Sequence, residues 1–138
     1  PLTYTPEEFI PFNFEYNLSS VTNTFRKAGI PTAILTIPSK LSGDPLKLTP
    51  EDIRTITLPD YLEDDLSAFI NVYRSYDSII RAVAVESGSI LINAAAGFGR
   101  TDGGVGDFFT DTFDLSPEGC AHLGEIVARE LREKGVPT

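Results

Sequence analysis

The chain has 138 residues, of which 41% are hydrophobic and 22% are charged, proportions typical of a single globular domain with one core. Its formal net charge of −9 repels phosphate backbones and anionic lipid surfaces, and the basic residues form no patch that would override this repulsion, so we expect neither nucleic acid nor membrane as a partner. No run of about 20 apolar residues is present, which indicates a soluble protein and leaves its compartment open.

The first predicted element is a helix near the N-terminus. Thr5-Pro6-Glu7-Glu8 has the form of a capping box, with a capping hydroxyl followed by proline at the first helical position. Pro11 lies too far inside this segment for a first-turn proline, so we expect a kink there or a late start near Phe12. A stripe at helical spacing predicts the buried face as far as Gly29, formed by Phe14, Leu18, Val21 and Phe25.

Two continuous apolar runs, residues 32–37 and 90–95, predict neighbouring or near-neighbouring central parallel strands covered on both faces. Residues 38–59 have no sustained period and predict a long surface excursion without regular structure. A long amphipathic helix is predicted over residues 58–86, with Gly88 as its stop. Its apolar stripe is Leu62, Leu66, Phe69, Tyr73, Tyr76, Ile80 and Val83.

The C-terminal part of the chain predicts a long loop followed by a last helix. Residues 97–114 are rich in glycine and aspartate and include three phenylalanines, which we expect to anchor the loop to the core rather than line a pocket. Ser116-Pro117 caps the helix, and Gly135 closes it. Its predicted buried stripe is Cys120, Leu123, Val127 and Leu131, while the lone histidine, His122, is expected on the helix surface.

Helices alternating with apolar strands indicate the α/β class, with a parallel sheet between layers of helices. The sequence predicts only two strands, whereas parallel sheets commonly have about four to six. We therefore expect residues 1–138 to form a single but incomplete domain.

Residues 111–119, Asp-Thr-Phe-Asp-Leu-Ser-Pro-Glu-Gly, resemble the last block of the SGNH/GDSL hydrolases, Asp-x-x-His-Leu-Ser-Pro-Glu-Gly. In that family the aspartate orients the histidine, which deprotonates a serine near the N-terminus of the domain. Asp111 falls on the aspartate position and Asp114 on the histidine position, so these two are the candidate catalytic residues by position.

The resemblance extends over residues 5–134 and implies the C-terminal half of such a domain. Thr5-Pro6-Glu7-Glu8-Phe9 resembles the stretch after the family's Gly-x-Asn-Asp block, and residues 76–93 resemble the helix and strand before its final catalytic loop. The implied fold is a three-layer, flavodoxin-like parallel sheet flanked by helices. The implied activity is hydrolysis of acyl esters or carbohydrate esters by a Ser-His-Asp triad, with a small acyl ester or acylated sugar as ligand and no cofactor.

Three departures from the family pattern predict that this chain alone is inactive. The 138 residues contain no Gly-Asp-Ser-Leu block and no Gly-x-Asn-Asp block, which supply the nucleophile and oxyanion donors. A carboxylate at position 114 is a feeble base toward a serine hydroxyl, and two acids three residues apart should repel each other or share a proton. We expect the absent parts to come from an N-terminal segment or a second chain.

Two alternatives remain open at this stage. A noncatalytic ligand-binding or interaction module on the same scaffold would account for Asp114, and a homo-oligomer could complete its sheet. A calcium site is the other alternative, because carboxylates crowd one glycine-rich loop, but the spacing fits no EF-hand and a solvated acidic loop is favoured, so no metal is expected. The carboxylates concerned are Asp102, Asp107, Asp111 and Asp114.

Overall fold

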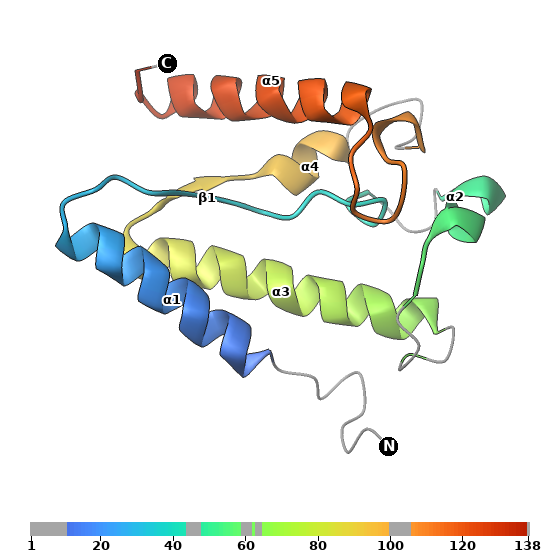
Figure 1. Ribbon diagram of the computed structural model, residues 1–138, viewed down its shortest axis with the longest axis horizontal. Coiled ribbons are helices and arrows are strands. Elements are labelled where there is room, and N and C mark those ends of the chain that lie inside the picture. The colour runs from blue at the N-terminus through green and yellow to red at the C-terminus, as the bar shows by residue number, and fades with distance from the viewer. Residues whose placement is uncertain (1–10, 44–47, 59–61, 63–64, 100–105, 138) are drawn as a thin grey trace. The chain divides into compact units, whose positions relative to one another are not determined.

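The computed structural model describes residues 11–43, 48–58, 62, 65–99 and 106–137 (Figure 1). These residues form helices and two short parallel strands, a mixed composition that is compatible with the predicted α/β class. No helix in these ranges is both long enough and apolar enough to cross a membrane. The elements are α1 (Phe12–Lys27), β1 (Ala33–Leu35), α2 (Pro50–Thr55), α3 (Leu66–Ser87), β2 (Ile90–Ile92), α4 (Ala94–Phe98), the 3₁₀ helix η4 (Gly106–Phe108) and α5 (Pro117–Glu133).

Strands β1 and β2 pair in parallel as a two-stranded sheet within the described residues. The Ile90 N–H donates to the Thr32 carbonyl at 2.9 Å, and the Thr36 N–H donates to the Ile92 carbonyl at 3.0 Å. Both strands are shorter than predicted, and Ala33 is exposed, so burial on both faces is wrong for β1. The run at 90–95 ends early because Asn93 leaves the extended conformation and three alanines, strong helix formers, start α4.

Contacts divide the chain into two compact units, of which the first comprises Pro1–Ile34 and Leu58–Leu91. In this unit α1 packs against α3, and the rings of Phe14 and Tyr76 meet edge to face at 4.8 Å. The long amphipathic helix is confirmed, since most of its predicted stripe is buried. It begins at Leu66 rather than near residue 58, where the Asp65 side chain caps it, and ends at Gly88 in the left-handed conformation.

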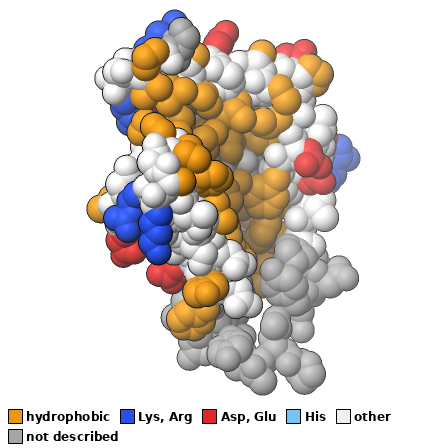
Figure 2. Space-filling view, turned by 60° about the vertical axis from the view of Figure 1, so that its left-hand side comes forward, with side chains coloured by type: hydrophobic (Ala, Val, Ile, Leu, Met, Phe, Trp, Pro, Cys, Tyr) orange, Lys and Arg blue, Asp and Glu red, His pale blue; other side chains and the backbone are white. Residues whose placement is uncertain are grey.

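Helix α1 begins at Phe12 with Pro11 at its N-cap, which confirms the late start. The predicted capping box, residues 5–8, lies outside the described residues. The predicted buried stripe is wrong in its second half, because Val21 and Phe25 are exposed. Thr22 is buried instead, with its hydroxyl donating to the Leu18 carbonyl at 2.9 Å, so this helix tolerates a polar residue on its packed face. Hydrophobic side chains are visible at the molecular surface in Figure 2.

The second unit comprises Leu35–Thr57 and Ile92–Thr138, and in it α5 packs against α4 and η4. Phe98 is fully buried at its centre, with ring centroids of Phe108 and Phe109 at 5.5 and 5.3 Å. The predicted anchoring role of the loop phenylalanines is confirmed for Phe109, which is buried, whereas Phe113 is exposed.

The packed face of α5 differs from the predicted one, because Cys120 is exposed and Gly119 and Ile126 are buried. The reason is a close approach at the first turn. A Cβ atom on Gly119 would lie 2.0 Å from the Phe108 carbonyl oxygen, so only glycine allows the backbone of Phe108 to pack directly against the first turn of α5. The Ser116 cap is confirmed, since its side chain accepts a hydrogen bond from the Gly119 N–H.

Helix α2 lies inside the excursion predicted to lack regular structure. Thr49 and Asp52 form a reciprocal capping box, and Pro50 stands at the first helical position. The signal was present in the residue types, but six residues are too few to display an apolar period.

Candidate functional site

Residues 109–115 form a short hairpin, here called the acidic hairpin, that carries both candidate acids. Phe109 and Leu115 form an antiparallel bridge, and the Thr110 N–H donates to the Asp114 carbonyl at 2.8 Å. Asp111 therefore lies at the tip, and Asp114 lies on the returning arm.

Ser116 joins the base of the acidic hairpin to α5. Its N–H donates to the Phe108 carbonyl at 2.9 Å, and its hydroxyl donates to the Asp107 carbonyl at 2.6 Å. The same hydroxyl oxygen accepts the Gly119 N–H at 3.0 Å. This geometry explains the Leu-Ser-Pro-Glu-Gly sequence locally: serine caps the helix, Pro117 occupies its first turn, and glycine permits the close approach to Phe108.

The tip of the acidic hairpin is attached to the segment that follows β1. The Lys40 N–H donates to the Thr112 carbonyl at 3.0 Å, and the Thr57 N–H donates to the Thr112 hydroxyl oxygen at 2.9 Å. The buried Thr36 hydroxyl, directly after β1, accepts the N–H of Ala95, which follows β2. The hairpin thus lies beside the chain leaving the carboxyl ends of the strands, the edge at which open α/β folds bind ligands.

Asp111 is held in its ionised form by its neighbours. The Thr112 N–H donates to its carboxylate and is the main cause of a lowered pKa, and the hydroxyls of Thr112 and Thr57 act in the same direction. Lys40 adds a favourable charge. This lysine is only 4% exposed, and its ammonium donates to the Thr55 hydroxyl. A lowered pKa means that Asp111 is not the protonated member of a shared-proton pair.

Asp114 is exposed, and the groups that act on the Asp111 carboxylate come from Thr112, Thr57 and Lys40 rather than from Asp114. The acidic hairpin thus brings the two acids into one loop. Within the described ranges, no three acidic, histidine or cysteine side chains gather in a way that could hold a metal ion. Asp102, one of the four acids considered for calcium, lies outside those ranges.

His122 is not the ordinary surface residue predicted from its place in the helix. Its ring stacks on Phe108 with centroids 4.6 Å apart and meets Phe98 edge to face at 4.9 Å. Its Nε2 atom lies 3.3 Å from the Gly97 carbonyl, so we assign the proton to Nε2. The rings of α4 and η4 cover the first turns of α5, and His122 is part of that packing.

Asn93 directly follows β2 and is half-buried. Its backbone N–H helps to lower the pKa of Glu130, whose main hydrogen-bond donor is the Lys134 ammonium. Asn93 therefore contributes to the packing of α5 through its backbone.

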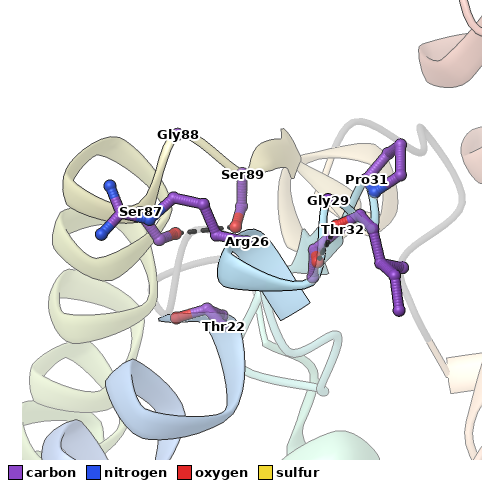
Figure 3. Close-up of a pocket in the computed structure, with 9 residues that line it drawn as sticks. Thr22, Arg26, Gly29, Pro31, Thr32, Ser87, Gly88 and Ser89 are labelled. Atoms are coloured by element: carbon purple, nitrogen blue, oxygen red, sulfur yellow. Dashed lines mark hydrogen bonds between the residues drawn. The ribbon is translucent and has the colours of Figure 1, made fainter. Parts of the chain in front are cut away.

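The first unit contains a cavity of about 250 Å³ between the ends of α1 and α3 (Figure 3). Gly29 and Gly88 mark the two helix ends, and the hydroxyls of Ser87 and Ser89 are hydrogen-bonded at 2.7 Å. Arg26 is the charged residue of its lining, and its cation complements the negative dipole ends of both helices. Because this cavity lies before the strands, at their amino ends, we assign Arg26 a structural role.

The chain matched none of the protein-family models, curated proteins or solved structures with which it was compared. The candidate site is therefore defined by the residues and hydrogen bonds of this chain. Of the sequence-predicted site residues, Asp111 and Asp114 share the acidic hairpin. The sequence did not reveal the groups that hold Asp111, which come from Thr112, Thr57 and Lys40.

Proposed function

We propose that this chain is the C-terminal half of an SGNH/GDSL-type ester hydrolase domain with a three-layer, flavodoxin-like sheet. It supplies the aspartate of the triad as Asp111 and carries Asp114 at the position of the general base. The observation that carries the proposal is Asp111, whose carboxylate accepts the Thr112 N–H and whose pKa is thereby lowered, in a hairpin that is hydrogen-bonded to the chain following β1 and lies directly before a serine-capped helix.

The chemistry of a triad requires such an aspartate. An ionised, hydrogen-bonded carboxylate accepts the imidazole N–H, fixes its tautomer and stabilises the imidazolium that forms during proton transfer. Asp114 cannot take the place of that imidazole, because an ionised carboxylate only accepts hydrogen bonds. Under this proposal Asp111 has the environment that a triad aspartate requires, whereas position 114 lacks the base.

The nucleophile and oxyanion donors come from an N-terminal segment or a second chain, and the ligand is a small acyl ester or acylated sugar. A parallel sheet of two three-residue strands is too small for independent stability and is completed by added strands. Large hydrophobic residues in the first unit are exposed and available for burial by the added part: Phe12, Tyr16, Val21, Phe25 and Ile30.

The isolated 138-residue chain is expected to hydrolyse p-nitrophenyl acetate no faster than buffer. Its sequence contains no Gly-Asp-Ser-Leu nucleophile block, and position 114 holds a weak base. The measurement is p-nitrophenolate release, with and without a serine-directed phosphonate. Turnover that the phosphonate abolishes would show that the assignment of roles is wrong.

Asp114→His is expected to give an imidazole whose pKa lies about 1 unit or more above the ordinary value near 6.5, because the Asp111 carboxylate accepts its N–H and attracts its charge. The pKa is measured by NMR titration of the ring protons, with His122 as the second histidine signal. Asp111→Asn in the same variant should return the imidazole toward its ordinary pKa. An unchanged pKa in both variants would contradict triad geometry in the acidic hairpin.

A noncatalytic ligand-binding module on this scaffold is the second candidate, and Asp114 is the observation that favours it. In that case two copies of the chain complete each other's sheets along open edges. Sedimentation distinguishes the two proposals, since the module predicts a species of twice 15.0 kDa and the hydrolase half predicts a 15.0 kDa chain that awaits its other part.

A further inference from the structure

Thr112, between the two acids of the hairpin, is 1% exposed, and all its polar groups have partners. Its N–H donates to the Asp111 carboxylate, and its carbonyl accepts the Lys40 N–H at 3.0 Å. Its hydroxyl oxygen accepts the Thr57 N–H at 2.9 Å. Thr112 thus connects Asp111 with Lys40 and Thr57, which both belong to the segment between β1 and α3.

The Thr112 hydroxyl oxygen accepts the Thr57 N–H at 2.9 Å, and the hydroxyl is also among the groups that lower the pKa of the Asp111 carboxyl. Thr112 is held by two backbone N–H groups, those of Lys40 and Thr57, and its own N–H donates to the Asp111 carboxylate. The position of the carboxylate therefore depends on backbone atoms that the fold holds in place.

We propose that Thr112 is the positioning residue of the acidic hairpin: its N–H holds the Asp111 carboxylate, while its carbonyl and hydroxyl oxygens accept the N–H groups of Lys40 and Thr57. This inference rests on the proposed function in one respect, that Asp111 is the triad aspartate. A carboxylate offers about four lone-pair positions, so the bond from the Thr112 N–H leaves room for the N–H of a general base.

The first test compares Thr112→Val, which keeps the branched shape and removes the hydroxyl, with Thr112→Ser, which keeps the hydroxyl. Carboxyl NMR titration should show the pKa of Asp111 moving up toward its ordinary value in Thr112→Val, because a donor to the ionised form is lost. Thr112→Ser should keep the pKa lowered. An Asp111 pKa that is unchanged in Thr112→Val would overturn the proposal.

A matched control lies in the same unit. The pKa of Glu130 is lowered mainly by the Lys134 ammonium, 2.7 Å away, and should stay lowered in Thr112→Val. Lys134→Met should raise the Glu130 pKa and leave that of Asp111 unchanged. If Glu130 also moves in Thr112→Val, the variant has disturbed the whole unit and the hydroxyl has no specific positioning role.

Amide hydrogen exchange tests the same arrangement, even if Thr112→Val does not fold. In the unaltered chain, the Lys40 and Thr57 amides should exchange more slowly than free amides, because Thr112 accepts from both. Thr112→Val should accelerate exchange at Thr57 by about two- to tenfold, the effect of one ordinary hydrogen bond, and Thr112→Ser should not. Unprotected amides at both positions in the unaltered chain would refute the role of Thr112. Neither measurement depends on ester hydrolysis, so the role of Thr112 is tested separately from the proposed hydrolase function.

Discussion

Phe98→Ala is expected to lower the free energy of unfolding by about 3–5 kcal/mol, because it removes a large ring from a fully buried site and leaves a cavity. The Phe98 ring contacts Phe108, Phe109 and His122, with centroids 4.9 to 5.5 Å away. The loss therefore affects the packing of α4, η4 and α5 together. Urea unfolding followed by far-ultraviolet circular dichroism measures the change.

Phe113→Ala is the matched control, since it removes the same atoms from a side chain that is 43% exposed and should cost less. Equal losses in the two variants would contradict the assignment of Phe98 to the centre of the second unit. The slope of the free energy against urea must be the same in both variants for the comparison to hold.

Gly119→Ala is expected to destabilise the second unit by about 3 kcal/mol, at the upper end of the usual cost of overpacking. The added Cβ would lie 2.0 Å from the Phe108 carbonyl oxygen, a backbone atom that cannot turn aside as a flexible side chain can. To relieve the clash, α5 must separate from η4, which strains the hydrogen bond from the Ser116 N–H to the Phe108 carbonyl.

Gly124→Ala in the same helix should have the opposite sign. A Cβ atom there meets nothing within 4 Å, and alanine favours a helix interior by about 1 kcal/mol over glycine. Thermal unfolding of the two variants measures the contrast. If Gly119→Ala also raises the melting temperature, the close approach to Phe108 is not present in solution.

The sequence predicted those elements whose signals are local and repeated. The apolar stripe of α3 recurs over many turns, so Gly88 and most of its buried positions could be assigned. The helical start at Ala94 could not be assigned, because a short apolar run fits a strand or a buried helix equally well. The face of α1 was also misassigned, because the polar side chain of Thr22 indicates exposure, whereas its hydroxyl is satisfied within the helix and the residue is buried.

For the candidate site, the sequence placed Asp111 and Asp114 but not the groups that hold them. The Thr57 N–H and the Thr112 hydroxyl are 55 residues apart in the chain, and no local pattern links such a pair. Nothing in the sequence indicates that Lys40 is buried, because lysine is almost never buried; its burial depends on α2 and the acidic hairpin, which pack around it.

The Ser116 hydroxyl makes the acidic hairpin and the first turn of α5 a single cooperative element. The Ser116 hydroxyl donates to the Asp107 carbonyl and its oxygen accepts the Gly119 N–H. When one of these bonds breaks, the hydroxyl can rotate, and this weakens the other bond. Fraying at the start of α5 therefore loosens the acidic hairpin. Conversely, opening of the acidic hairpin removes the cap of α5. Any ligand or partner segment that orders this hairpin would, by the same connection, lengthen the lifetime of the helix behind it.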